Sequence, residues 1–457
     1  MLFSSQLFIV VFLPLSLAAF YTFSGRHILK LLALLSASTV FYAWWDPRFL
    51  PLLLGSISLN WLLVRLHFRV GANWCLTAGV IVNLALLGLF KYANFFAESV
   101  LSLVGVAHDP WSIVLPLGIS FFTFQQISYL VDVRRGEAGQ YSLLEYACYV
   151  SFFPQLIAGP IVRHGELIPQ FNTPVWRADH LEMVGRGAVL FSLGLAKKVF
   201  FADEIAGIAN DGFAIAEAIS TMDAWSAAFA FSLQLYFDFS SYSDMAIGLG
   251  AMFGFRLPIN FDTPYRATDI RVFWRRWHIT LSNFLRDYVY IPMGASRGAV
   301  MSTMAVVMIT MLLCGLWHGA GWTFVAWGAL HGAAICCSRL WINVGIRLPS
   351  LMAWSVTMIT VLVGWVLFRA ESFSDAFAIL QAMLGSTPIT DNLADGDDWT
   401  IIGIGMLFAI LGPTNVELSK HRLVQTRTVA IVSAILLTLV CLRVGQGRGL
   451  EFIYFQF

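Results

Sequence analysis

The sequence predicts an all-α integral membrane protein with about 11 to 13 transmembrane helices and further re-entrant or interfacial helices. Of its 457 residues, 58% are hydrophobic and only 12% are charged, whereas a soluble domain carries about 25% charged residues. So large an apolar surplus does not fit inside one soluble core, because a water-facing surface needs charge. The net charge is +1 and there is no long run of basic residues, so nothing in the sequence indicates binding of nucleic acid.

Apolar stretches follow one another along the whole chain, many near the length of about 20 residues that a bilayer-crossing helix needs. They occupy residues 5–23, 29–45, 48–66, 75–92, 110–131, 142–162, 182–201, 223–237, 241–256, 300–317, 320–341, 351–369, 399–413 and 428–443. Some are too short or too polar to cross simply, so re-entrant pieces are expected among them. The first is expected to be a retained helix, since no basic residue precedes Phe8–Phe20. Without a repeat or a long hydrophilic linker, residues 1–457 are interpreted as one polytopic domain.

The placement of Lys and Arg predicts the orientation of the chain. The first loop, Arg26–Lys30, is basic, as is the third, which holds Arg65 and Arg69, while the loop between them is nearly neutral. The positive-inside rule then puts these two basic loops in the cytoplasm and the N-terminus on the outer side. The acidic segment 391–398 contains no Lys or Arg and suits the outer face.

The segment 258–298 is both charged and aromatic. Its arginines are Arg266, Arg271, Arg275, Arg276, Arg286 and Arg297. A single charge at the bilayer centre costs about 3 kcal/mol on insertion scales, so this segment does not cross lipid directly. We expect an amphipathic helix pair that lies at the interface or dips into a protein-lined cavity.

His318 is the first candidate catalytic residue. It lies between two apolar stretches, and Gly315, Gly319 and Gly321 surround it. A histidine at membrane depth is energetically costly unless it has a function or is well hydrogen-bonded. The ordinary pKa of its side chain suits a general base near neutral pH. The glycines leave room for a substrate or for close helix approach. A histidine that only packs helices together is the alternative.

Two further histidines belong to the same part of the chain. On one continuous helix, His278 would share a face with Trp274 and Ser282; the alternative is an interfacial histidine bonded to lipid headgroups. His331, thirteen residues after His318, is expected to make structural hydrogen bonds. The sequence has no HExxH and no third ligand at a metal-site spacing, so no metal site is predicted.

A polar cluster interrupts the apolar run before residue 245. Asp238, Tyr242 and Asp244 stand there among serines and must face protein or water. Either carboxylate could orient a histidine or, as we favour, pair with an arginine. Nucleophile elbows, P-loops and dinucleotide-binding fingerprints are absent from the sequence, which disfavours a hydrolase, an ATPase and a dinucleotide oxidoreductase.

A series of ordered motifs runs along most of the chain. They are Gly118–Gln125, Phe152–Ile161, Gly194–Val199, Tyr236–Asp244, Phe273–Ser282, Leu285–Pro292, Leu316–Gly319, Trp327–Gly332 and Phe452–Phe457. Together they resemble the bacterial membrane-bound O-acyltransferases of the alginate O-acetyltransferase type. The resemblance implies a ring of transmembrane helices around a central tunnel, with a catalytic core at about residues 110–345.

The resemblance also implies roles for individual residues. His318 corresponds to the family's invariant histidine and would take the proton of an acceptor hydroxyl. His278 corresponds to the second catalytic-region histidine and would position the acyl carbonyl or stabilise its charge. Asp238 or Tyr242 would fix a histidine tautomer. Trp317, His331 and Asp244 complete the supporting set.

No bound cofactor is implied, and acetyl-CoA or another acyl-CoA is the implied donor. Its phosphates would be bound from the cytoplasmic side by Arg271, Arg275, Arg276 and Arg286. The implied acceptor is an exopolysaccharide or a periplasmic partner protein at a bacterial inner membrane, with the N-terminus in the periplasm. Two other functions stay open: a transporter or channel, although no matching halves are seen, and a non-catalytic scaffold that recruits a periplasmic transferase.

Overall fold

The computed structural model describes residues 1–107, 109–294, 300–385, 393–414, 416–417, 426–444 and 452–453. Every regular element within those ranges is helical, which confirms the predicted all-α class. Predictions that concern Arg297, residues 391–392 of the acidic segment and residues 454–457 of the terminal motif lie outside the described residues. The chain forms two compact units. Unit 1 is Met1–Ser192, Asp244–Pro258 and Arg422–Gly445; unit 2 is Leu193–Ser243, Ile259–His421 and Gln446–Phe457.

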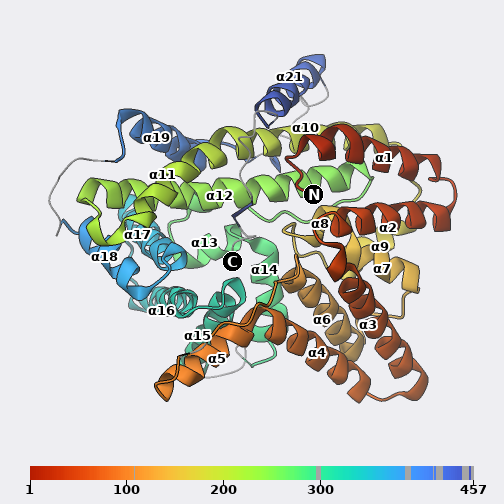
Figure 1. Cartoon of the computed structure of the whole chain (residues 1–457), viewed down its shortest axis with the longest axis horizontal. Helices are drawn as coiled ribbons and strands as arrows, with labels where there is room; N and C mark the ends of the chain where they lie inside the picture. Colours follow the sequence, from red (N-terminus) through yellow and green to blue (C-terminus); the bar gives the residue numbers. More distant parts are fainter. Residues whose placement is uncertain are drawn as a thin grey trace. The chain divides into compact units, whose positions relative to one another are not determined.

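Unit 1 is a set of helices from the first part of the chain, joined by one helix from its end (Figure 1). Their bounds are α1 Leu13–Thr22, α2 His27–Ala43, α3 Leu50–Val70, α4 Trp74–Leu87, α5 Ala93–Leu103, α6 Ile119–Arg135, α7 Leu143–Ser151, α8 Phe153–Leu156, α9 His164–Phe171, α10 His180–Lys197 and α21 Arg427–Val444. The last residues of α10 belong to unit 2.

Buried amides connect the helices of unit 1. Asn83 on α4 donates to the side-chain oxygen of Asn60 on α3 at 2.7 Å, and Asn60 donates to Gln126 on α6 at 3.0 Å. All three side chains are buried, while many apolar side chains of these helices are exposed. Polar side chains inside and apolar side chains outside are the reverse of a soluble protein. This arrangement suits a bilayer, where polar groups must find partners inside the protein.

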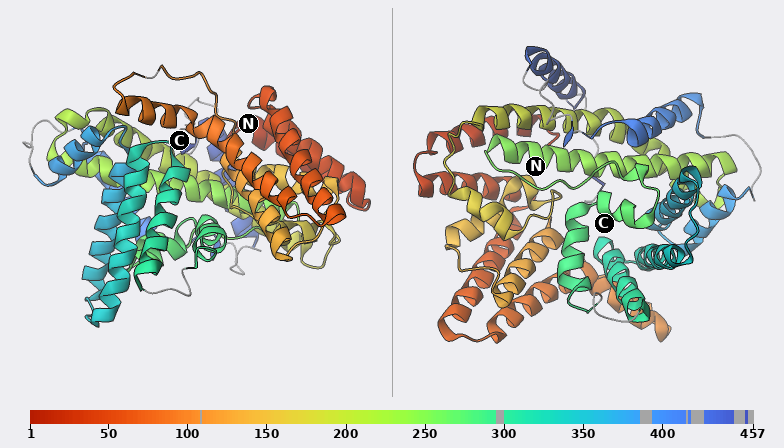
Figure 2. Two further views of the ribbon diagram at one scale, coloured as in Figure 1. Left: turned by 90° about the horizontal axis from the view of Figure 1, so that it is seen from below. Right: turned by 180° about the vertical axis from the view of Figure 1, so that it is seen from behind.

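Unit 2 carries the rest of the chain. Its helices are α11 Asp203–Ala214, α12 Thr221–Met252, α13 Ile270–Arg276, α14 Ile279–Leu285, α15 Val300–His318, α16 Trp322–Val344, α17 Ser350–Arg369, α18 Phe373–Met383 and α19 Gly396–Leu411, and the last turns of α12 belong to unit 1. Helices α15, α16 and α17 pack side by side (Figure 2). Gly328 on α16 lies directly against the Met311 carbonyl of α15, so the two backbones approach closely.

Six helices in the described part of the chain are long and apolar enough to cross a membrane. They span Pro47–Val70, Trp74–Leu103, Val300–His318, Trp322–Ile342, Ser350–Arg369 and Arg427–Val444. Three more apolar helices, Phe8–Thr22, His27–Ala43 and Phe373–Met383, are shorter. Of the other predicted stretches, 142–162 divides into α7 and α8, whereas 223–237 and 241–256 join in the single helix α12. The chain is therefore a multi-pass membrane protein in which full-length spans are combined with short helices.

One charge used to predict the orientation does not lie in a loop. Lys30 is part of α2 and is buried, and its ammonium group donates to the carbonyl of Phe171 at 2.8 Å. Arg26 and the exposed His27 remain at the start of this helix. The first loop is therefore less basic than its sequence indicates.

Candidate active site

His278 lies at a break between two short helices. Helix α13 ends at Arg276 and α14 begins at Ile279, while His278 adopts the left-handed conformation with φ of 43°. The prediction of one continuous helix that aligns Trp274, His278 and Ser282 is therefore wrong. A non-glycine residue in this conformation costs of order 1–3 kcal/mol and persists only where its surroundings impose it. Here the Ile279 amide donates to the Asn260 carbonyl at 2.9 Å.

The His278 ring is fully buried among aromatic side chains. Phe239 of α12 meets it edge-on, with ring centroids 4.7 Å apart, and Trp317 lies 6.0 Å away. The ring of His318 is 6.3 Å from that of His278. Burial lowers the pKa of His278, so its imidazole is neutral at physiological pH. The structure thus brings together the two histidines that the sequence singled out.

His318 is the last residue of α15 and is only 4% exposed. Its ring contacts those of Trp327 from α16 and Phe368 from α17, at centroid distances of 5.1 and 5.3 Å. Trp317 lies beside it at 4.9 Å. A Cβ atom on Gly319 would overlap the Phe324 ring, so any larger residue here would displace this ring. Side chains from α15, α16 and α17 therefore surround the His318 imidazole.

His331 is held by a hydrogen bond from the same region. The Trp274 indole donates to His331 Nδ1 at 3.3 Å, and the His331 side chain is buried. On its other side, Nε2 faces Gly364, where an added Cβ would lie 2.9 Å away. These contacts agree with the expected structural role. His318 and His331 lie on separate helices, since α15 ends before α16 begins.

Asp238 pairs with a lysine that the sequence analysis did not single out. Lys198 Nζ lies 2.8 Å from Asp238 and 2.7 Å from Asp203, and the side chains of all three are at most 6% exposed. The backbone N–H of Ile453 also donates to Asp238, at 2.7 Å. The favoured ion pair is present, with lysine in place of the expected arginine. The other two members of the cluster are buried on the same helix, and the Tyr242 ring contacts that of Phe452 at a centroid distance of 4.7 Å.

Three of the four arginines expected to bind the donor have neighbours of their own. Arg271 pairs with Asp269, the N-cap of α13, at 3.0 Å. Arg286 pairs with Asp287 at 2.7 Å, and Arg276 donates to Thr263 at 3.3 Å. Arg275 and Arg286 are exposed, whereas Arg271 and Arg276 are partly buried.

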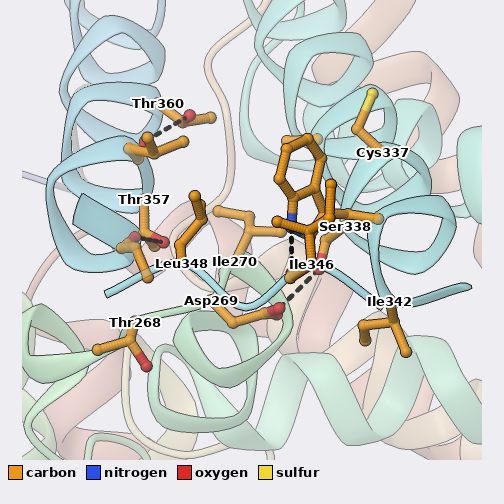
Figure 3. Close-up of a pocket in the computed structure, with 14 residues that line it drawn as sticks. Thr268, Asp269, Ile270, Cys337, Ser338, Ile342, Ile346, Leu348, Thr357 and Thr360 are labelled. Atoms are coloured by element: carbon orange, nitrogen blue, oxygen red, sulfur yellow. Dashed lines mark hydrogen bonds between the residues drawn. The ribbon is translucent and has the colours of Figure 1, made fainter. Parts of the chain in front are cut away.

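A cavity of about 510 Å³ opens between α16, α17 and the start of α13 (Figure 3). Most of its walls are apolar, and on one side Ser338 donates to Asp269 at 2.6 Å. Its lining includes Thr268, Asp269, Ile270, Cys337, Ser338, Ile342, Ile346, Leu348, Thr357 and Thr360. Neither His278 nor His318 lines this cavity, so it is distinct from the histidine pair.

Asn260 is the site residue that sequence reasoning missed. Its side-chain oxygen lies 3.1 Å from His278 Nδ1, and it accepts from the Thr280 amide at 3.2 Å and the Thr280 hydroxyl at 2.9 Å. Asn260 is fully buried. The only signal in the sequence was an amide between the apolar residues Ile259 and Phe261.

The arrangement is suited to acid–base chemistry. Two imidazoles lie close together, one at the end of α15 and the other at the break between α13 and α14, in surroundings made mostly of aromatic rings, and an imidazole can accept or donate a proton. Among the residues that the structure describes, no group of three His, Cys, Asp or Glu side chains could hold a metal ion. Fold and site together define a polytopic helical membrane protein with a buried pair of histidines.

Comparisons with known proteins identify the family. The model of MBOAT, the membrane-bound O-acyltransferase family, matches residues 119–373, and the chain belongs to this family. It is 45% identical over 395 residues to "Probable alginate O-acetylase AlgI" of Pseudomonas aeruginosa, covering 84% of this chain and 75% of the relative. It is 40% identical over 423 residues to the peptidoglycan O-acetyltransferase of Helicobacter pylori, covering 84% and 80%. A teichoic acid D-alanyltransferase of Streptococcus thermophilus is 26% identical over 239 residues, covering 50% and 57%. The protein is therefore an acyltransferase.

Proposed function

We propose that this protein moves an acetyl group from acetyl-CoA, or another short acyl group from its thioester, to a hydroxyl group on the far side of the membrane. The acceptor is an exopolysaccharide or a periplasmic partner protein. Two relatives are named as an alginate O-acetylase and a peptidoglycan O-acetyltransferase. These names support a polysaccharide as the final acceptor. The whole of residues 1–457 acts as one catalytic domain in the bacterial inner membrane, with the N-terminus in the periplasm.

The observation that carries the proposal is the pair formed by His278 and His318, with ring centroids 6.3 Å apart. A thioester carbonyl is already activated, so its transfer to oxygen needs no covalent serine intermediate. It needs a base for the hydroxyl, a stabiliser for the developing oxyanion and close alignment of the two substrates. Two neighbouring imidazoles meet the first two needs.

The donor approaches from the cytoplasm and the acceptor from the periplasm, through a tunnel that ends at the histidines from both sides. Only the acyl group then has to cross the membrane, and coenzyme A remains in the cytoplasm. Arg275 is assigned to a donor phosphate because it is exposed near the end of α13, whereas the other exposed arginine, Arg286, is paired with Asp287. A guanidinium forms two parallel hydrogen bonds to a phosphate.

The test is transfer of radiolabelled acetyl from acetyl-CoA to a polysaccharide acceptor by the protein in proteoliposomes. The native protein and a His27→Ala control, in which an exposed histidine is lost, should transfer label equally. His318→Ala should transfer about 10²- to 10⁴-fold more slowly, the range for loss of an acid–base or oxyanion group. Native rates in His318→Ala would remove this residue from the mechanism.

A further inference from the structure

The orientation of the Asn260 amide is determined by a backbone group. The N–H of Thr280 can only donate, and it points at the Asn260 side-chain oxygen at 3.2 Å. If the amide were flipped, its NH₂ group would face this donor, and both sides would lose their hydrogen bond. The assigned orientation also lets the NH₂ group donate to the Ser243 hydroxyl at 3.2 Å. The atom 3.1 Å from His278 Nδ1 is therefore an oxygen.

An oxygen at that position determines the tautomer of His278. A carbonyl oxygen only accepts, so His278 Nδ1 must carry the proton. In a neutral ring the other nitrogen, Nε2, then holds a lone pair. The side chain is 0% exposed, and Nε2 has no hydrogen-bond partner among the described residues. A buried acceptor without a partner is costly, and such atoms are usually explained by a role.

We infer that Asn260 is a positioning residue that fixes His278 as its Nδ1–H tautomer, so that His278 Nε2 takes the proton of the acceptor hydroxyl. This inference rests on the proposed acyl transfer. The hydroxyl proton passes to Nε2 while the hydroxyl oxygen bonds to the thioester carbonyl carbon. The carbon–sulfur bond then breaks, and the sulfur leaves with its electron pair and takes the proton from the imidazolium as a thiol.

This assignment exchanges the roles expected from the sequence. A neutral His278 with its lone pair at Nε2 cannot donate a hydrogen bond from that atom to an oxyanion. Stabilising the acyl oxygen is then left to the neighbouring His318. A residue 18 positions before the histidine in sequence determines which of the two imidazoles is the base.

The first test reads the tautomer directly and does not depend on activity. Long-range proton–nitrogen NMR spectra of protein labelled at histidine nitrogens distinguish Nδ1–H from Nε2–H rings, and loss of a signal in His278→Gln assigns His278. The Nδ1–H form is expected in the native protein, and an altered tautomer population in Asn260→Ala. An Nε2–H or doubly protonated His278 in the native protein would overturn the inference.

The second test separates positioning from folding by kinetics. Asn260→Ala should lower kcat about 10- to 100-fold and leave the KM values of donor and acceptor within about twofold. Asn260→Asp keeps an accepting oxygen and should recover most of this loss. Ser243→Ala is the matched control, since it removes the other bond of the Asn260 amide, and should keep near-native kcat.

Equal impairment of Asn260→Ala, Asn260→Asp and Ser243→Ala would mean that Asn260 only supports the fold, and would overturn the inference. Native kcat in Asn260→Ala would overturn it as well. If the native protein transferred no acetyl group, the proposed function would be wrong. The NMR spectra would still determine the tautomer of His278.

Discussion

Both compact units contain buried histidines, and His164 of unit 1 and His278 of unit 2 are held differently. In unit 1, both ring nitrogens of His164 are bonded, Nε2 to Asp132 at 3.0 Å and Nδ1 to the Tyr141 hydroxyl at 2.9 Å. In unit 2, His278 is bonded at Nδ1 by Asn260, and its Nε2 has no hydrogen-bond partner in the described part of the chain. A fully bonded histidine contributes to stability, whereas one with an open lone pair can react. The open lone pair at Nε2 therefore distinguishes His278 from His164; in His331, Nδ1 accepts from Trp274, so Nε2 of the neutral ring carries the proton and offers no lone pair.

The largest expected effect is the loss of transfer in His278→Gln. Glutamine fills a similar volume but cannot take up a proton at neutral pH, so kcat should fall about 10²- to 10⁴-fold. The melting temperature in detergent should stay close to the native value, because the glutamine NH₂ group can still donate to Asn260 and the lost Nε2 makes no hydrogen bond to the described residues. Single-turnover transfer of labelled acetyl measures the effect. A variant that melts much earlier and keeps its kcat would make His278 structural, and the contrast with His164 would fail.

The helices around the site supply the next prediction. An alanine Cβ at Gly315 of α15 would overlap the Phe324 carbonyl of α16, a backbone atom that cannot rotate away. Gly315→Ala should therefore destabilise the protein by about 3 kcal/mol, at the upper end for overpacking. Gly403→Ala on α19 is the matched control, since nothing lies within 4 Å of its Cβ position. Equal thermal stability of the two variants would show that α15 and α16 can separate without cost.

Sequence patterns predicted the helical membrane class and singled out His318, and the resemblance to the family added a catalytic role for His278. Those inferences depend on composition and on short motifs, which local sequence carries. They could not predict the left-handed turn at His278, because no glycine marks it. Nor could they predict Asn260 or the Lys198–Asp238 pair, whose members lie 18 and 40 positions from their partners. Contacts over such separations depend on tertiary packing, and an isolated Asn or Lys has many possible roles.

The structural side of the comparison is tested at His164. His164→Ala removes the partner of Asp132 and of the Tyr141 hydroxyl, and should destabilise the protein by about 2 kcal/mol. Its kcat should stay within about twofold of native once the folded fraction is corrected for. Thermal unfolding in detergent and transfer of labelled acetyl measure the two quantities. Lost kcat at native stability would give His164 a catalytic role and break the contrast between the units.

The smallest expected effect concerns the donor. Arg275→Gln should raise the KM for acetyl-CoA about fivefold, close to 1 kcal/mol, because an exposed guanidinium is well solvated and its ion pair is weak. Arg48→Gln is the matched control, since Arg48 is also exposed but pairs with Asp46 in unit 1. Its KM should be native.

The choice of donor decides whether a phosphate is responsible for the Arg275 effect. S-acetyl-pantetheine carries the same thioester and the same reacting atoms as acetyl-CoA but no phosphate groups. If Arg275 binds phosphate, Arg275→Gln and the native protein should have equal KM values for this short donor and should differ only for acetyl-CoA. A fivefold difference in KM with both donors would mean that Arg275 acts on the fold of α13 and, through it, on His278. Donor binding by Arg275 and the positioning of His278 would then not be separable.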